Sequence, residues 1–219
     1  MPGTLDNLRI IIPFCILSFI SCKCSRPVVD TPPPTLNTNL NHLKFSVEEA
    51  PGWSNLFLRK SGWIGADGIF AIPFNGVDTS GAGRRQETLL LFSDTILGEI
   101  VKDSIRPGFK MVHNSVAVIK GNEPLEENIQ FHHHTKPDGS PESMFIPATP
   151  NSKPGDYYWL GDGFVNPSKA GATYIFGYRV RDTSAASFGF AEVGTRLSKY
   201  PKEASRPLPT RNKWTHHFF

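Results

Sequence analysis

The sequence predicts an all-β protein, and three observations support this fold class. Glycine and proline each occur 19 times, which indicates many turns and disfavours long helices. Short apolar segments recur between turn signals such as Pro51-Gly52, Asn75-Gly76 and Asp138-Gly139. The length of 219 residues suits one large β domain. Together these features are typical of a sandwich, a barrel or a propeller.

Turn residues separate nearly all of the segments that have strand character, so each is expected to form a short strand. These segments are residues 43–47, 56–58, 64–72, 88–96, 115–120, 129–133, 157–160, 172–181 and 188–197. The domain that they build is expected to span residues 43–200.

The first 21 residues have the pattern of a secretory signal peptide. Arg9 precedes an apolar run, Ile10 to Ile20, that is too short to span a bilayer comfortably. The run ends in Ser21-Cys22, which resembles the lipobox of bacterial lipoproteins and predicts lipidation at Cys22. The alternative is a plain signal peptide with incidental cysteines. Either way the protein is expected to be exported, to the periplasm or as a lipoprotein of the outer membrane or cell surface.

Two further segments differ in composition from the domain. Residues 22–42 are rich in proline, asparagine and threonine and predict an extended tether. Residues 201–219 have no strand period and predict an irregular tail, or a domain that continues beyond this chain; we favour the second interpretation. The three cysteines, Cys15, Cys22 and Cys24, all precede the domain, so its body has neither a disulfide nor a cysteine metal site.

Two aspartates between small or polar neighbours adjoin the most apolar strand candidates. Asp67 stands in Gly-Ala-Asp-Gly and Asp94 in Phe-Ser-Asp-Thr. Cleavage of a glycosidic bond needs one carboxylic acid and one carboxylate. Asp67 is the candidate base or nucleophile, and Asp94 is the candidate acid because partial burial would raise its pKa. The alternative is that both residues close turns at strand ends.

Other side chains could contact a sugar or an ion. His113 and Asn114 could bind hydroxyl groups or orient a carboxylate, and Trp63 and Trp159 could stack on sugar rings; each could equally be structural. The His132-His133-His134 run predicts no metal site, because neighbouring side chains of a strand point to opposite faces. No cofactor is expected, although a structural calcium ion at Asp156, Asp162 and Asn166 is left open, with a spacing that fits no standard loop.

Three blocks of sequence, in order, resemble a known group of proteins. They are Gly62-Trp63 with Gly65-Ala66-Asp67-Gly68, then Leu89 to Thr95 with Gly98 and His113-Asn114-Ser115, then Tyr157 to Gly163. They look like secreted bacterial domains similar to glycoside hydrolases with five-bladed β-propellers. The resemblance implies carbohydrate chemistry for Asp67, Asp94 and Asp162. Blades take about 40 to 50 residues each, so this chain would supply about three and leave the propeller incomplete at its C-terminus.

The sequence therefore predicts a lipid-anchored, glycan-directed protein that hydrolyses a polysaccharide or oligosaccharide with paired carboxylates. The alternatives are a surface lipoprotein that binds glycans without catalysis, or an interaction scaffold. A net charge of +3 from nearly balanced basic and acidic residues disfavours nucleic acid as a partner. The protein is expected to be a monomer that meets the membrane only through its lipid anchor.

Overall fold

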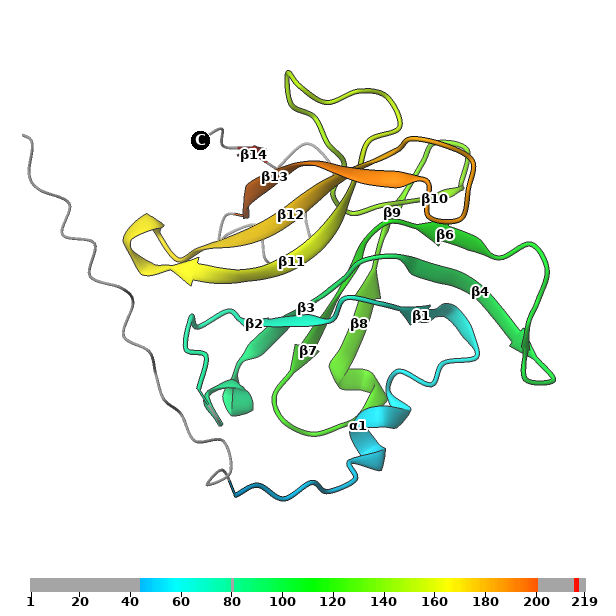
Figure 1. The fold of residues 1–219 in the computed structure, drawn as a ribbon. Coiled ribbons are helices and arrows are strands. Elements are labelled where there is room, and N and C mark those ends of the chain that lie inside the picture. Colours follow the sequence, from blue (N-terminus) through cyan, green and yellow to red (C-terminus); the bar gives the residue numbers. More distant parts are fainter. Residues whose placement is uncertain (1–43, 80, 201–214, 217–219) are drawn as a thin grey trace, which may run out of the picture. The chain divides into compact units, whose positions relative to one another are not determined.

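The computed structural model describes residues 44–79, 81–200 and 215–216, and these residues form antiparallel sheets, so the all-β prediction is confirmed (Figure 1). The chain divides into two units, residues 1–47 and 48–219, and all the elements below belong to the second. The predicted signal peptide, Cys22 and nearly all of the tether lie outside the described residues. Within the described ranges, no helix has the length and apolar character needed to cross a bilayer.

The second unit has one short α-helix and three 3₁₀ turns among its described residues. The helical segments are α1 (Pro51–Asn55), η2 (Ala82–Arg85), η3 (Glu126–Asn128) and η4 (Pro167–Lys169). The strands of the first half are β1 (Ser61–Ala66), β2 (Phe70–Pro73), β3 (Glu87–Phe92), β4 (Thr95–Val101), β5 (Ser104–Ile105), β6 (Lys110–Val112), β7 (Ser115–Lys120) and β8 (Ile129–His132). Those of the second half are β9 (His134–Thr135), β10 (Pro141–Glu142), β11 (Tyr157–Asn166), β12 (Ala172–Asp182), β13 (Phe190–Tyr200) and β14 (Thr215–His216).

Three long strand paths in the first half all bend at the same level. The bends fall between β1 and β2, between β3 and β4, and between β6 and β7. On one side of the bends β2, β3, β7 and β8 form an antiparallel sheet, and on the other β4 pairs with β1, β5 and β6. Pairing continues through the bend, where the Asp67 and Ser93 amides donate to the Asp94 and Asp67 carbonyls over 3.2 and 3.0 Å. The bends therefore redirect continuous strand pairs.

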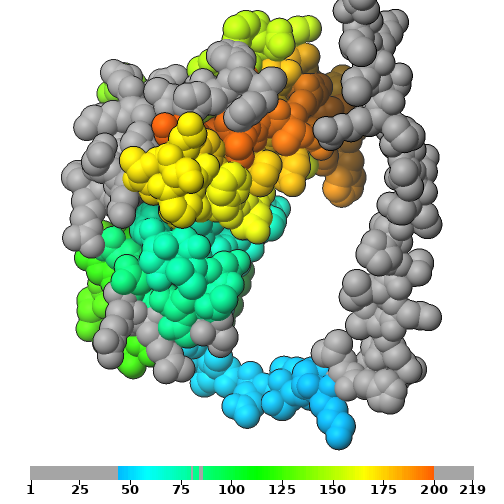
Figure 2. Space-filling view, turned by 90° about the vertical axis from the view of Figure 1, so that its left-hand side faces the viewer, coloured from blue at the N-terminus to red at the C-terminus, as the bar shows by residue number. Residues whose placement is uncertain are grey.

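The second half is a meander, β11-β12-β13-β14, that packs on the first sheet (Figure 2). Figure 2 shows the yellow β11–β12 hairpin seated on the teal β2–β3 segment. The core between the sheets consists of Ile72, Leu89, Leu91, Val116, Met144, Phe145, Tyr158, Leu160 and Ile175. A second core on the other face of the first sheet gathers Trp63, Phe92 and Phe131 beside Leu56 at the end of α1.

Buried polar side chains join the bends to β11. The Ser93 hydroxyl donates to the Leu160 carbonyl and accepts from the Leu160 amide, at 3.3 and 3.0 Å. The Asn114 amide group donates to the Phe145 and Tyr158 carbonyls, both at 2.9 Å, and its oxygen accepts from the Phe145 amide at 2.7 Å. Since every one of these groups has a partner, their burial costs little and fixes the bends against β11.

The expected elements differ from the observed ones in five segments. Residues 44–47 form no strand, and Leu56 to Leu58 form the turn that ends α1, which begins at Pro51 as proline favours. Leu56 is buried in the second core, so its apolar character reflects packing rather than a strand. The segments 64–72 and 88–96 each divide into two strands, at Asp67 and Asp94. Part of the expected irregular tail, Thr215–His216, pairs with β13.

A buried carboxylate and two arginines stabilise the start of the second sheet. The Asp156 side chain is 0% exposed and receives hydrogen bonds of 2.6 and 2.8 Å from the Arg181 guanidinium. Arg179 Nε lies 3.6 Å from the same carboxylate. The hydrogen bonds from Arg181 are the main cause that lowers the pKa of Asp156 from 3.8 to about 2. Asp156 thus contributes stability that is present above its ordinary pKa and is lost as the pH falls towards 2.

We predict that Asp156→Asn lowers the free energy of unfolding by about 2 kcal/mol or more at neutral pH, because it removes the negative charge shared by two partly buried arginines. Denaturant titration gives this value. The matched control is Glu99→Gln, which breaks the exposed pair with Arg106 and should cost about 0.5 kcal/mol or less.

The pH dependence of the same variants provides a second readout. Between about pH 4 and pH 2 the wild type should lose more stability than Asp156→Asn, since the variant has no carboxylate to protonate at this position. Parallel acid curves for the two proteins would contradict the assigned role.

Candidate functional site

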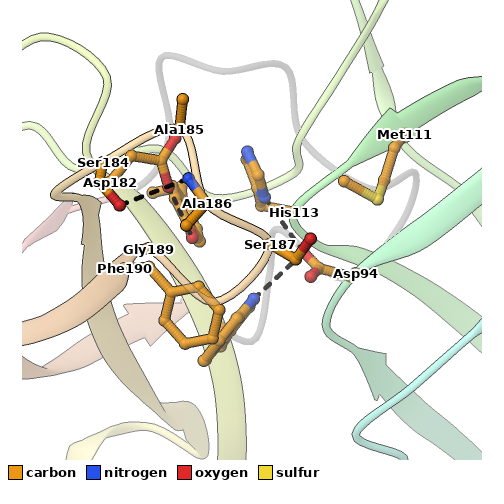
Figure 3. A pocket seen from close by; sticks show the side chains of 12 residues that line it. Asp94, Met111, His113, Asp182, Ser184, Ala185, Ala186, Ser187, Gly189 and Phe190 are labelled. Carbon is orange, nitrogen blue, oxygen red and sulfur yellow. Dashed lines mark hydrogen bonds and ion pairs between the residues drawn. The ribbon is translucent and has the colours of Figure 1, made fainter.

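A cavity of about 320 Å³ lies beside the bends, where the two sheets meet (Figure 3). Asp94, Met111 and His113 line it from the first sheet, and Tyr157, Trp159 and Asp182 line it from the second. Figure 3 shows the loop between β12 and β13, with Ser184 to Ala186 and Gly189, opposite Asp94 and Met111. Both halves of the domain are thus needed to form the cavity.

Side-chain alternation places these residues in the cavity. Ser93 and Thr95 are buried, so Asp94 between them points the other way, and the same holds for His113 beside the buried Asn114. In β11, Tyr158 and Leu160 point into the core, which leaves Tyr157 and Trp159 on the opposite face. The buried bonds at the bends therefore fix the cavity residues indirectly.

Two N–H groups converge on one oxygen of Asp94. Trp159 Nε1 donates to Asp94 Oδ1 over 3.1 Å, and His113 Nδ1 lies 3.1 Å from the same oxygen. An ionised carboxylate only accepts hydrogen bonds, so the proton of the neutral His113 ring belongs on Nδ1. The other ring nitrogen, Nε2, is then the acceptor of the neutral ring. This arrangement holds a carboxylate in a defined orientation.

Aromatic rings surround the carboxylate. His113 stacks on Tyr157 with ring centroids 3.7 Å apart and planes 14° apart. The Tyr157 hydroxyl donates to Asp182 Oδ1 over 3.3 Å, and burial first and then the Asp182 charge raise the pKa of Tyr157 to about 12. Phe190 meets Trp159 edge to face at 4.9 Å between centroids. Tyr157 therefore stays protonated at neutral pH. The walls of the cavity are aromatic rings whose edges carry polar groups, the Tyr157 hydroxyl and Trp159 Nε1.

Asp67 lies next to Asp94 across the bend. Burial raises the pKa of Asp67, and the negative charge of Asp94 adds to the rise, although backbone hydrogen bonds oppose it. Gly68 allows the bend to be this tight: its φ is +59°, and a Cβ there would lie 2.9 Å from Ser93 Oγ. The two residues therefore adjoin through their backbones, but the Asp67 side chain is exposed and does not line the cavity, whereas Asp94 lines it and is held by two N–H groups.

The structure places the other predicted site residues elsewhere. Asp162 is exposed in a bulge of β11, where it accepts a 2.7 Å hydrogen bond from the Gly163 amide. Trp63 is 6% exposed and stacks on Phe131 in the second core at 4.5 Å. Asn114 is 0% exposed and bonded to the backbone. These three residues do not line the cavity, whereas Asp94, His113 and Trp159 come together there.

The sequence interpretation missed several residues of the cavity. Met111, Tyr157, Asp182 and Phe190 line it without having been expected there. Alternation along Tyr157-Tyr158-Trp159 puts the first and third residues on one face, which was the available signal for Tyr157. Asp182 and Phe190 reach the cavity through the β12–β13 loop, and nothing in the local sequence indicates its path.

The described residues hold no group of three or more His, Cys, Asp or Glu side chains that could bind a metal ion. Of the three calcium candidates, Asp156 is paired with arginines and Asn166 accepts a hydrogen bond from the Ser168 amide in η4. Asp162 is bonded to its own strand.

A second cavity adjoins the first. It measures about 420 Å³, shares Met111, His113 and Tyr157 with the first cavity, and continues past Lys136 and Glu142 of the β9–β10 region. The stacked His113–Tyr157 pair therefore stands between two hollows, which suits a ligand longer than one small ring.

Residues 52–215 match the family described as a domain of unknown function (DUF5005). The chain belongs to this family. The search of curated proteins finds no match. Among solved structures, the chain is similar to a crystal structure of a "putative hydrolase" from Bacteroides ovatus ATCC 8483, with 19% identity and a TM-score of 0.52. The match covers 70% of this chain and 39% of that chain, so the DUF5005 chain spans about two fifths of the solved protein and shares its fold over that part.

We predict that Asp94→Asn lowers the pKa of Asp67, because it removes the neighbouring negative charge and leaves the effect of burial opposed by the backbone hydrogen bonds. Titration of the side-chain carboxyl carbons by NMR measures the change. The control Asp103→Asn removes an exposed carboxylate far along the chain and should leave the Asp67 pKa unchanged. An unchanged value in Asp94→Asn would show that the two charges do not interact.

Proposed function

We propose that this DUF5005 protein is a hydrolase that cleaves a glycosidic bond with Asp67 and Asp94. The observation that carries the proposal is Asp94, which two N–H groups hold in an aromatic-walled cavity, with Asp67 hydrogen-bonded to its backbone at the bend. Partial burial and the Asp94 charge raise the pKa of Asp67, whereas Asp94 accepts two N–H bonds as an ionised carboxylate does. The proposal therefore exchanges the roles expected from the sequence: Asp67 is the acid and Asp94 is the base.

The proposed reaction consumes one water molecule. Asp67 donates its proton to the glycosidic oxygen as the bond from that oxygen to the anomeric carbon breaks. Asp94 accepts a proton from a water molecule whose oxygen forms the new bond to the anomeric carbon. His113 and Trp159 act as positioning residues that hold Asp94 in orientation. Proton exchange with solvent then restores both carboxyl groups.

Three observations support a glycan as the substrate. Tyr157, Trp159 and Phe190 offer ring faces and edges of the kind that pack on the apolar faces of sugars. The adjoining second cavity offers room for further sugar units of an oligosaccharide or polysaccharide. The fold shared with the Bacteroides ovatus structure, which is described as a "putative hydrolase", is in keeping with hydrolysis.

The proposal includes the propeller architecture and the membrane anchor. Two packed four-stranded antiparallel sheets, β2-β3-β7-β8 and β11-β12-β13-β14, have the size and order of propeller blades. Lipidation at Cys22 after removal of residues 1–21 would tether the domain, as a monomer, to the outer membrane or cell surface. The support for the anchor is the sequence pattern alone.

We predict that Asp94→Asn and Asp67→Asn each reduce hydrolysis by about 10²-fold or more, since general acid and base groups contribute on that scale. Release of reducing ends from a panel of polysaccharides measures the activity, and circular dichroism verifies folding. Asp103→Asn serves as the charge-matched control and should retain full activity. Wild-type rates in both Asp67→Asn and Asp94→Asn would contradict the assignment of these residues as the catalytic acid and base.

A glycan-binding protein without catalysis is the second candidate, favoured by the aromatic walls. In this case Trp159→Phe, which keeps a ring but loses the Nε1 donor, should bind glycans nearly as well as the wild type. Trp159→Ala should weaken binding by about tenfold, and isothermal titration calorimetry distinguishes the two. If the protein is a hydrolase, Trp159→Phe should instead reduce kcat more than it raises KM, because Asp94 loses an orienting bond.

A further inference from the structure

A third cavity lies behind β11, on the face of the strand opposite Trp159. It measures about 290 Å³ and is lined by Thr149, Tyr158, Arg179, Thr195 and Arg196, among others. Tyr158 alternates with Tyr157 and Trp159, so this cavity and the Asp94 cavity open on opposite faces of the same sheet. The proposed hydrolysis does not use it.

The lining of this cavity carries an excess of positive charge. Arg179 and Arg196 line it, and its described lining includes no acidic residue. Asp156 lies beside Arg179 but also holds Arg181 bidentately, so one carboxylate faces two guanidinium groups. Glu192 accepts a hydrogen bond from the Thr195 hydroxyl but is exposed and does not line the cavity. The charge of Arg196 adds to an already positive region.

The Arg179 guanidinium is held in place by the fold. It donates to the Thr149 hydroxyl over 3.3 Å and to the Val193 carbonyl over 2.9 Å. Gly194 lies opposite Arg179 in the register and beside its guanidinium. A planar donor fixed in this way is prepared to bind an oxyanion without a further loss of side-chain freedom.

Two buried polar atoms at the cavity point to a ligand. The Tyr158 hydroxyl and Arg179 Nε are both buried and make no hydrogen bond within 3.5 Å among the described residues, although Arg196 interacts with the hydroxyl oxygen and Asp156 Oδ2 lies 3.6 Å from Nε. Tyr158 is 1% exposed, so its hydroxyl group is cut off from bulk water. A buried hydroxyl proton without an acceptor is unfavourable, so an acceptor in the cavity would be stabilised beside it. An anionic oxygen can accept from both a hydroxyl and a guanidinium.

We propose that this cavity, defined by Tyr158, Arg179 and Arg196, binds an oxyanion group, either a free phosphate or sulfate or the acidic group of a small organic ligand. Arg179 and Arg196 supply the charge, and the Tyr158 and Thr195 hydroxyls complete the set of polar groups. The site uses neither Asp94 nor Asp67, so a test of anion binding does not depend on the proposed hydrolase activity.

Binding is measured with the full chain by thermal unfolding and calorimetry at constant ionic strength, with phosphate, sulfate or acetate replacing chloride. At least one oxyanion should raise the unfolding temperature in a saturable way, because it binds the folded state. Arg196→Gln should weaken this binding by tenfold or more, and Arg196→Lys should retain part of it. The charge-matched control Lys110→Gln is exposed, lines none of the three cavities and should bind like the wild type.

The three probes distinguish the sources of the anion. Preference for phosphate or sulfate assigns a tetrahedral group, and preference for acetate assigns a carboxylate. NMR of the arginine Nε resonances in the wild type gives a second readout that needs no variant, and the signals of Arg179 and Arg196 should shift together. The absence of any saturable response, or an equal response in wild type and Arg196→Gln, overturns the proposal.

Discussion

The architecture of the domain depends on the buried polar bonds at the strand bends. A bend exposes backbone groups that a straight ladder would pair, and burying them unpaired would cost about 1 to 3 kcal/mol each. The Asp67 and Ser93 amides stay paired across the bend, and the Ser93 and Asn114 side chains pair the buried backbone groups of β11 and of Phe145. The Thr95 hydroxyl donates to the Ser93 carbonyl, so the Ser115 hydroxyl, 2.8 Å away, must donate to Thr95. The bend is therefore a closed network in which each member has a partner.

This network sets the geometry of the Asp94 cavity. Asp94 and His113 are the outward-facing neighbours of Ser93 and Asn114, and Tyr157 and Trp159 flank the carbonyl of Tyr158 to which Asn114 donates. A displacement of β11 by one residue would replace both cavity aromatics with core residues and break the Asn114 bonds. The register of β11 therefore also fixes the geometry of the site, which explains how side chains from distant segments meet within 3.1 Å.

The sequence was sufficient for the fold class and for part of the site. Seven of the expected strand segments coincide with observed strands, because alternation and turn residues are local signals. Asp94, His113 and Trp159 were predicted and meet in one cavity. Trp63 and Asn114 carried the same signals but are buried, since an aromatic ring or an amide on a strand has the same local pattern in a core as in a cavity. Only the packing of the second sheet on the first separates the two cases.

The second sheet also separates two electrostatic environments. On the face with Tyr157 and Trp159, Asp94 and Asp182 line the cavity, whereas Arg179 and Arg196 line the cavity on the face with Tyr158. Carboxylates repel an acidic sugar at short range, so the Asp94 cavity is suited to neutral sugar units. An anionic ligand would instead be stabilised on the opposite face, where Asp156 leaves the arginines only partly neutralised. Because the side chains of β11 alternate between its two faces, this strand presents aromatic residues to two cavities of opposite charge.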